Sequence, residues 1–320
     1  MGEFDFIAQY LAPLAGKEGL GLIDDCAVFT PIAGRDLILT KDAMVEGVHF
    51  PRGQFDAVTA SKLLRVNLSD LAAKGARPEG YLLSLALPKS FDDNCAKDFT
   101  AGLGAAQGKF GIKLWGGDTT STDGPLTISA TLIGSVPAGK AVLRTGAQSG
   151  DLLFVTGTIG DARLGLDVAL GREITGNVAD KAHWLAAYNA PQPRLDMGAM
   201  LRDYASAALD ISDGLIADAG HLAKASGVAL RIESSSVPLS KPAQDWLASG
   251  GEIETLLTGG DDYQVLFTAA AKHAPAMQDA ARAQGLTLTQ IGQTHEGQGV
   301  ECYDADGGVM GFARGGWAHF

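Results

Sequence analysis

The sequence predicts a two-domain protein of the α/β class, and three observations carry this prediction. The chain has 320 residues, which is enough for two domains with an ample core. Apolar runs of strand length alternate with segments whose apolar residues recur at helical spacing. A polar, glycine-containing link over 144–151 separates two such series and is typical of a domain boundary. We therefore expect one domain over 1–147 and a second, α/β domain over 148–320.

The first domain is predicted to combine three helices with five strands. The helices are expected over 4–15, 56–73 and 91–110, with Asp56 as the N-cap of the second. The strands are expected over 23–29, 37–40, 81–87, 112–115 and 126–136. In the helix over 56–73, Asn67, Asp70 and Lys74 share one face, while leucines 64, 68 and 71 turn towards the core.

The second domain is predicted to alternate strands and helices in the same way. Its strands are expected over 152–156, 206–209, 228–232 and 264–268. Its helices are expected near 160–170, 178–188, 193–203, 215–225 and 252–257, before a final α/β section.

Composition narrows the class of function. The net charge is −12 and there is no Lys/Arg run, which argues against a nucleic-acid partner. The three cysteines form no CxxC pair, so neither a zinc site nor a disulfide framework is indicated. No apolar run approaches the ~18 residues of a membrane span, and residues 1–5 lack the pattern of a signal peptide. We expect a cytoplasmic protein without a membrane partner.

Acidic residues next to glycine, serine or threonine recur at the ends of predicted apolar segments. These stretches are Asp24-Asp25, Thr40-Lys41-Asp42, Asn67-Leu68-Ser69-Asp70, Gly116-Gly117-Asp118-Thr119-Thr120 and Asp210-Ile211-Ser212-Asp213-Gly214. Carboxylates suit Mg²⁺, and glycine-rich backbone suits phosphate. Each stretch alone is equally compatible with a solvated turn, and their repetition favours a site for phosphates and divalent metal.

The segment 210–214 allows two interpretations. Ser212 or Asp213 can act as the N-cap of the helix that follows. Alternatively, the free N–H groups at the helix start hold a phosphate while the acids hold its metal.

Six blocks together resemble a known family. They are IDDCAVF at 23–29, LTKDAMVEGVHF at 39–50, VNLSDLAAKGARP at 66–78, WGGDTT at 115–120, LDISDGLIADAGHL at 209–222 and LTGGDDYQVLFT at 257–268. On these blocks the chain resembles the thiamine-phosphate kinases (thiamine-monophosphate kinases), of the superfamily that includes aminoimidazole ribonucleotide synthetase. The resemblance covers essentially the whole chain.

The resemblance implies ATP-dependent phosphorylation of thiamine phosphate to thiamine diphosphate, by direct in-line transfer assisted by Mg²⁺. It also implies a two-domain aminoimidazole ribonucleotide synthetase-like fold, with an N-terminal α+β domain and a C-terminal α/β domain. The N-terminal sheet would form a dimer-interface barrel, so a homodimer is expected. The N-terminal domain, 1–147, would bind ATP and Mg²⁺ and form the dimer.

The resemblance assigns roles residue by residue. Its metal ligands correspond to Asp25, Thr40, Lys41, Asp42, Asp70, Asp118, Asp210 and Asp213. Its ATP contacts correspond to Gly117, Asp118, Arg144 and Ser212, and its thiamine contacts to His49, Asp261 and Trp317. Asp42, Asp118 and Asp213 are the expected catalytic acids.

Three positions depart from the family pattern. Lys41 stands where the family usually has Thr, which puts one metal ligand in doubt, and Asp261 replaces a Glu that is one methylene longer. Ile23 replaces a glycine before the paired acids.

Other functions stay open on sequence alone. Aminoimidazole ribonucleotide synthetase and selenophosphate synthetase belong to the same superfamily, but the reactive Cys and Lys of the latter have no counterpart here. A non-catalytic, acidic metal-binding or assembly protein is a further alternative. ATP turnover with and without thiamine phosphate distinguishes these readings.

Overall fold

A computed structural model describes residues 2–313 and 315–317. The chain divides into two compact units, Met1–Leu71 with Ala76–Gly139, and Ala72–Gly75 with Lys140–Phe320. Within the described residues, no helix has both the length and the apolar character needed to cross a membrane. The assignment of separate functions to 1–147 and 148–320 stays a prediction.

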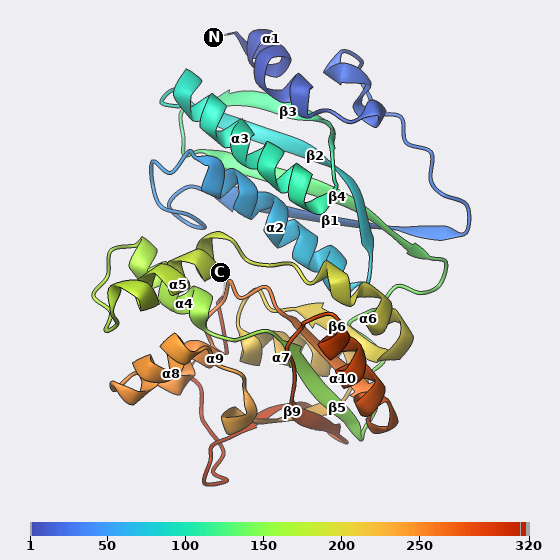
Figure 1. Ribbon diagram of the computed structural model, residues 1–320, viewed down its shortest axis with the longest axis vertical. Coiled ribbons are helices and arrows are strands. Elements are labelled where there is room, and N and C mark those ends of the chain that lie inside the picture. The colour runs from blue at the N-terminus through green and yellow to red at the C-terminus, as the bar shows by residue number, and fades with distance from the viewer. Residues whose placement is uncertain (1, 314, 318–320) are drawn as a thin grey trace. The chain divides into compact units, whose positions relative to one another are not determined.

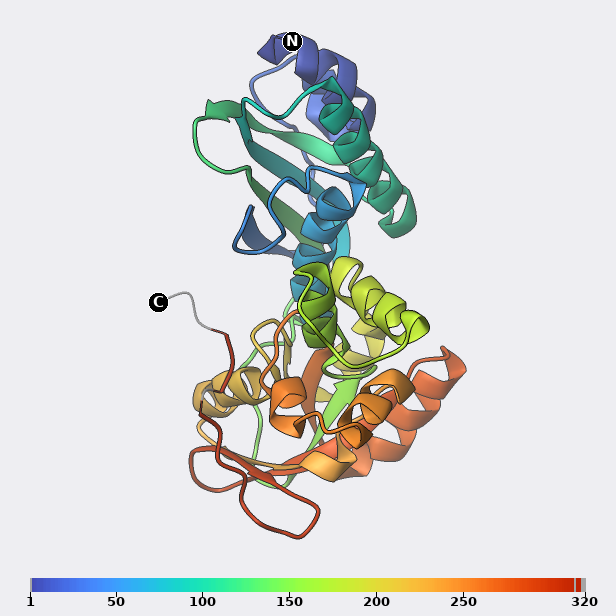
Figure 2. The ribbon, with the colours of Figure 1, turned by 90° about the vertical axis from the view of Figure 1, so that its left-hand side faces the viewer.

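The first unit is built on a four-stranded mixed sheet in the order β1-β4-β2-β3. Its strands are β1 (Arg35–Val45), β2 (Arg77–Pro88), β3 (Leu114–Thr122) and β4 (Thr127–Pro137). β2 and β3 run parallel, whereas the β1–β4 and β2–β4 pairs are antiparallel. The helices α2 (Ala57–Ala73) and α3 (Asp93–Phe110) cover one face of this sheet (Figures 1 and 2).

The caps and the apolar face of α2 agree with the sequence. The carboxylate of Asp56 accepts the Thr59 N–H at 2.9 Å, which confirms the predicted N-cap. Leu64, Leu68 and Leu71 are fully buried, as their helical spacing predicts. Asp92 caps α3 in the same way, through the N–H groups of residues 94 and 95.

The N-terminal segment is helical but irregular. α1 (Glu3–Phe6), the π-helical η1 (Ile7–Leu11) and the 3₁₀-helical η2 (Ala12–Leu14) follow one another without a break, and η3 (Lys17–Leu22) comes next. The strand predicted over 23–29 is wrong, because residues 24–26 form a bend and no ladder follows. Instead Phe29 stacks on Trp115 at a centroid distance of 4.7 Å, so this segment is held to β3 by side-chain packing.

Two strands continue further than predicted. β1 pairs with β4 from Arg35 to Val45, so Thr40, Lys41 and Asp42 lie inside the strand and not in a loop after it. β3 likewise contains the whole of 116–120. The hydrogen bonds between paired strands use only backbone groups, so polar side chains do not end a strand. The side chains of successive residues point to opposite faces of the sheet.

The second unit is built on a six-stranded sheet in the order β10-β7-β9-β5-β8-β6. The strands are β5 (Asp151–Thr156), β6 (Ala205–Asp210), β7 (Ala229–Glu233), β8 (Val265–Ala270), β9 (Leu288–His295) and β10 (Gly299–Tyr303). All neighbouring pairs are antiparallel except β7 and β10. The strands predicted in this part of the chain are confirmed.

Helices cover both faces of this sheet. α7 (Leu215–Ser226) packs against one face through a core that includes Leu209 and Leu266. α6 (Gly198–Tyr204) and α10 (Ala274–Ala283) pack against the other, around Phe154 and Phe267. Figure 2 shows α7 and α10 on opposite sides of the strands.

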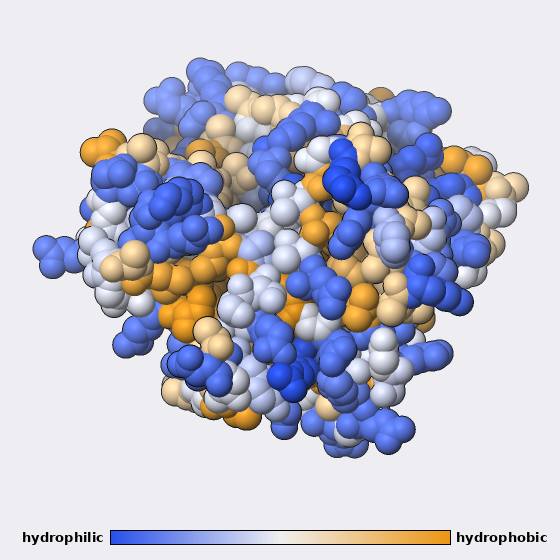
Figure 3. Space-filling model, turned by 60° about the horizontal axis from the view of Figure 1, so that its bottom comes forward, coloured by the Kyte–Doolittle hydropathy of each residue, from blue (hydrophilic) through white to orange (hydrophobic). Residues whose placement is uncertain are grey.

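A smaller apolar cluster joins the remaining helices of the second unit. It is formed by side chains of α4 (Asp161–Ala169), α5 (Val178–Asn189), α8 (Lys241–Ala248) and α9 (Ile253–Leu257), around the fully buried Trp184. The face drawn in Figure 3 is mostly hydrophilic, with hydrophobic side chains gathered in a few patches.

Candidate functional site

The polar side chains of β1 meet those of α2 in the first unit. The Thr40 hydroxyl donates to the Asp70 carboxylate at 2.5 Å. The Asp42 N–H donates to the side-chain oxygen of Asn67 at 3.0 Å, and the Asn67 amide donates to the Leu63 carbonyl. The structure therefore brings together Thr40, Asp42 and Asp70, as predicted, and adds the fully buried Asn67, which ties the strand to the helix.

Two carboxylates repel each other in this cluster. Burial, and next the charge of Asp70, raise the pKa of Asp42 to about 6. A divalent cation between these oxygens would remove the repulsion, and Mg²⁺ prefers such oxygen ligands. The donor set of one hydroxyl and two carboxylates therefore fits a metal of this kind.

Lys41 lies on the opposite face of β1 from its two neighbours. Side chains alternate along a strand, and Lys41 is exposed where Thr40 and Asp42 are half-buried. Only the main chain of Lys41 lies beside the acidic cluster, so its ammonium group does not replace a metal there.

We expect Lys41→Thr to leave the Mg²⁺ dependence of activity unchanged, because the variant keeps the carbonyl group and changes only the outward side chain. The measurement is the rate as a function of Mg²⁺ concentration in both proteins. A curve displaced by more than about twofold would show that the ammonium group neutralises bound phosphate.

Asp118 lies far from Asp42 in the sheet. The row of paired residues that starts at Asp42 runs through Ala130 and Leu83 to Gly117, so Asp118 belongs to the next row and faces the other side. Three inter-strand spacings separate the two strands, about 14 Å along the sheet. One chain therefore does not place the carboxylates of Asp42 and Asp118 in a common cluster.

Gly117 permits the close approach of β3 to β2. A Cβ atom at this position would lie 1.8 Å from the Leu83 carbonyl oxygen, so only glycine fits. Asp25 is exposed in the bend that precedes Phe29, and thus belongs to the segment packed against β3. Asp25, Gly117 and Asp118 therefore lie towards the β3 edge, and Thr40, Asp42 and Asp70 at the β1 edge.

His49 lies in the turn after β1. Its Nδ1 accepts a hydrogen bond from the Val45 N–H at 3.0 Å. With Nδ1 acting as the acceptor, the neutral ring carries its proton on Nε2. In that tautomer the donor group of the His49 ring is Nε2–H.

Three segments distant in sequence meet after β6 in the second unit. The N–H groups of Asp261 and Tyr263 donate to the carbonyls of Ser212 and Ile211, at 2.9 and 2.7 Å. The Trp317 N–H donates to the Asp213 carbonyl at 2.9 Å. The predicted residues Ser212, Asp213, Asp261 and Trp317 therefore belong to one backbone network, and Asp210 lies just before it at the end of β6.

The backbone is strained at this meeting point. Asp261 and Tyr263 have φ of 72° and 49°, the left-handed region that non-glycine residues seldom occupy. Trp317 is 57% exposed and carries a large, flat aromatic ring.

Arg144 is exposed in the segment that runs along the edge strand β6. The Leu143 carbonyl accepts the Ala208 N–H at 2.8 Å, and the Arg144 carbonyl accepts the Ser226 hydroxyl at 3.0 Å. The backbone around Arg144 is therefore fixed, while its guanidinium group extends from the surface.

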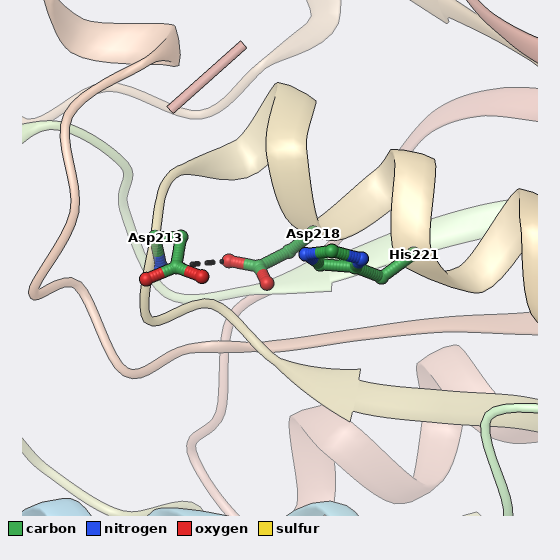
Figure 4. Close-up of side chains that lie close together, drawn as sticks. All are labelled: Asp213, Asp218 and His221. Carbon is green, nitrogen blue, oxygen red and sulfur yellow. Dashed lines mark hydrogen bonds between the residues drawn. The ribbon is translucent and has the colours of Figure 1, made fainter. Parts of the chain in front are cut away.

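A carboxylate of the chain itself occupies the start of α7. Asp218 Oδ2 accepts the N–H groups of Ser212, Asp213 and Gly214 at 3.0, 2.9 and 3.2 Å. Figure 4 shows the Asp218 carboxylate between Asp213 and His221. These three N–H groups precede Leu215, the first residue of α7, and they are not free for a phosphate, because the Asp218 carboxylate accepts them.

Two buried carboxylates in this region are absent from the predicted site. Burial raises the pKa of Asp218 to about 7, although its N–H partners act in the opposite direction. Burial also raises the pKa of Asp262, whose carboxylate accepts the Gly160 N–H at 2.8 Å. The sequence does not reveal either role. The N–H partners of Asp262 lie about 100 residues away in the chain. The N–H partners of Asp218 belong to the segment 210–214, which has the sequence pattern of a ligand-binding loop.

Comparisons with known proteins identify the family of the chain. Residues 23–136 match the family model of the AIR synthase related protein, N-terminal domain, and residues 148–305 match that of the C-terminal domain. The thiamine-monophosphate kinase of Caulobacter vibrioides is 44% identical, over 99% of this chain and 90% of that protein.

Two solved structures are similar over most of their length. The crystal structure of thiamine-monophosphate kinase from Stenotrophomonas maltophilia has a TM-score of 0.81 and 39% identity, covering 90% of this chain and 91% of that chain. A structure described as AaThiL complexed with AMPPCP and TMP has a TM-score of 0.79 and 34% identity, covering 100% and 97%. With similarity of this extent in sequence and in fold, the chain belongs to the thiamine-monophosphate kinase family of phosphotransferases, with the two-domain AIR synthase-like fold.

Proposed function

We propose that this protein transfers the γ-phosphoryl group of ATP to thiamine phosphate and forms thiamine diphosphate. The observation that carries the proposal is the full-length similarity to a structure described as a complex with AMPPCP, an ATP analogue, and TMP. The acidic cluster on β1 and α2 suits the reaction, because two polyphosphates approach each other only when cations reduce their charge.

Transfer is proposed to be direct and in line, with an oxygen of the phosphate group of thiamine phosphate as the nucleophile. Mg²⁺, when bound, would neutralise charge that develops on the transferred group. Asp25, Thr40, Asp42, Asp70, Asp118, Asp210 and Asp213 supply oxygen ligands to such ions, and Lys41 contributes at most its carbonyl group. No side chain needs to form a covalent phosphate, since positioning and charge neutralisation account for most catalysis of phosphoryl transfer.

The remaining predicted residues would bind and orient the substrates. Gly117, Asp118, Arg144 and Ser212 are assigned to ATP, with the Arg144 guanidinium group suited to pair with phosphate oxygens. His49, Asp261 and Trp317 are assigned to thiamine phosphate. A donor on Nε2 of His49 suits the phosphate, and Trp317 offers a stacking surface for an aromatic ring.

The direct test is turnover by the purified protein. We expect ADP and thiamine diphosphate to form in equal amounts from ATP and thiamine phosphate in the presence of Mg²⁺, with little ATP consumed when thiamine phosphate is omitted. ATP consumption that does not depend on thiamine phosphate would contradict the proposal.

Asp261→Asn should raise the KM for thiamine phosphate by about tenfold or more, which corresponds to ~1.4 kcal/mol. A hydrogen bond from the aminopyrimidine to a charged carboxylate is worth ~1.5–3 kcal/mol, and Asn removes that charge. Asn also tolerates the left-handed backbone that Asp261 adopts, so the turn should persist. The measurement is the KM for each substrate. The KM for ATP should stay within about twofold, and equal changes in both would show that Asp261 has only a structural role.

We also propose that the protein acts as a cytoplasmic homodimer whose N-terminal sheets form a barrel. The sheet face opposite α2 and α3 exposes apolar side chains on two strands, with Leu37, Leu39 and Leu82 at 37%, 65% and 38% exposure. A second copy that covers this face would bury them, and isologous pairing is the commonest arrangement of homo-oligomers.

A further inference from the structure

The carboxylate of Asp218 is the centre of the backbone network in the second unit. It lies in the first turn of α7 and is 2% exposed. Its Oδ2 atom accepts the three successive N–H groups of Ser212, Asp213 and Gly214. These bonds are strongest when the Asp218 carboxyl group is ionised.

The carbonyl groups of the same loop hold the other two segments. The Ser212 carbonyl accepts the Asp261 N–H, and the Asp213 carbonyl accepts the Trp317 N–H. Asp218 accepts the N–H groups of Asp213 and Gly214, which belong to the same peptide groups as the carbonyls of Ser212 and Asp213, so these two peptide groups are held from both directions. A change at Asp218 would therefore reach the two segments that carry Asp261 and Trp317.

Gly214 completes the loop between Ser212 and the helix. Its φ is 125°, and a Cβ atom there would lie 2.7 Å from the Thr258 carbonyl oxygen. The loop therefore passes close to the segment before Gly259 without a side chain between them. Its three N–H groups turn to Asp218, and the Asp213 carboxylate also lies within 4.8 Å of the Asp218 carboxylate. The bonds to Asp218 thus decide which way the peptide groups of residues 212–214 point.

We propose that Asp218 is a positioning residue for phosphoryl transfer, which sets the loop 212–214 and, through it, the segments of Asp261 and Trp317. It does not touch the substrates. Its Oδ2 atom also occupies the N–H groups of residues 212–214, so these three groups do not bind phosphate. The effect on catalysis rests on the proposed function, whereas the role of Asp218 in holding the loop 212–214 does not.

The test compares Asp218→Ala and Asp218→Asn with a matched control, Asp151→Asn. Asp151 is also buried, at 7% exposure, and its Oδ2 atom accepts the Gln148 N–H at 3.0 Å and the Ser206 hydroxyl at 2.6 Å. Asp151 pairs with Ala270 of β8, whereas Asp210, just before the loop, pairs with Val265 at the other end of that strand. It therefore lies at the far end of the sheet from the loop.

Two measurements separate positioning from general stability. Hydrogen exchange of the amides of residues 212–214, in protein without ligands, should be faster by about tenfold or more in Asp218→Ala and unchanged in Asp151→Asn. The kcat should fall by about a hundredfold in Asp218→Ala and by about tenfold in Asp218→Asn, which keeps one acceptor oxygen. In Asp151→Asn the kcat should stay within about twofold of the wild-type value, even if its melting temperature drops as far as that of the Asp218 variants.

The outcomes discriminate clearly. An unchanged exchange rate in folded Asp218→Asn or Asp218→Ala, or a kcat within about threefold of the wild type in both, would overturn the inference. Equal losses of kcat in Asp151→Asn would assign the effect to stability and overturn it too. If the wild type does not phosphorylate thiamine phosphate, the proposed function fails, while the exchange rates still decide whether Asp218 holds the loop.

Discussion

Replacing Asp42 with Asn is expected to lower kcat by about a thousandfold or more, with the fold intact. Asp42 is the half-buried carboxylate that lies with Asp70 in the cluster on β1 and α2. Loss of charge from a metal ligand removes several kcal/mol of transition-state stabilisation, and ~4 kcal/mol corresponds to a thousandfold in rate. The measurement is single-turnover and steady-state kinetics at saturating Mg²⁺. Near wild-type rates would exclude Asp42 from the metal site.

The stability of the same variant provides the folding control. In the metal-free protein the pKa of Asp42 is raised from 3.8 to about 6, so the folded state binds a proton more tightly than the unfolded state does. The free energy of unfolding therefore falls as the pH rises from about 4 to 6, and above pH 6 it is lowered by the full cost of burying the ionised Asp42. Asn carries no charge and avoids this cost. Without metal, Asp42→Asn should melt at a higher temperature than the wild type at pH 8 and at nearly the same temperature at pH 4. A lower melting temperature at pH 8 would show that the charge of Asp42 stabilises the fold.

Mixing two inactive variants is expected to restore activity. Asp42 and Asp118 lie on opposite edge strands and opposite faces of one sheet, so a single site that contains both would have to draw them from the two chains of the proposed homodimer. Asp42→Asn and Asp118→Asn should each be nearly inactive. In a mixed dimer, one site carries both substitutions and the other carries neither.

The expected recovery can be calculated. Random reassociation of equal amounts gives about half mixed dimers, each with one intact site, and thus about a quarter of the wild-type activity. The measurement is kcat per subunit after the variants are co-expressed or exchanged. Mixed dimers isolated with two different affinity tags should reach about half of the wild-type value.

Asp42→Asn mixed with Asp70→Asn is the matched control. These two residues lie in one cluster of the same chain, joined through Thr40 and Asn67, so every site of their mixed dimer carries one substitution. No activity should return. If the Asp42 and Asp118 variants also fail to complement each other while forming mixed dimers, the two residues act within one chain or in separate sites.

The sequence by itself determined the elements whose signals are local. Asp56 caps α2 because its own side chain reaches the N–H of Thr59, and the leucines of α2 are buried because their spacing follows the helical period. The strands β5 to β8 and the helices α4 to α7 and α9 of the second unit follow from the same short-range patterns. The recurring acidic blocks also indicated phosphate and metal chemistry, since the residue types that bind these ligands are visible without a structure.

Only the tertiary structure decided how those acids are grouped. Thr40, Lys41 and Asp42 read as one polar loop in sequence, but the ladder with β4 extends through them and turns Lys41 to the other face. Asp118 reads as a neighbour of the same cluster, but strand order places it at the far edge of the sheet. The three N–H groups after β6 read as free, but a buried carboxylate of α7 satisfies them. Strand order, register and hydrogen-bond partners depend on contacts between segments distant in the chain, and local propensity carries no information about these contacts.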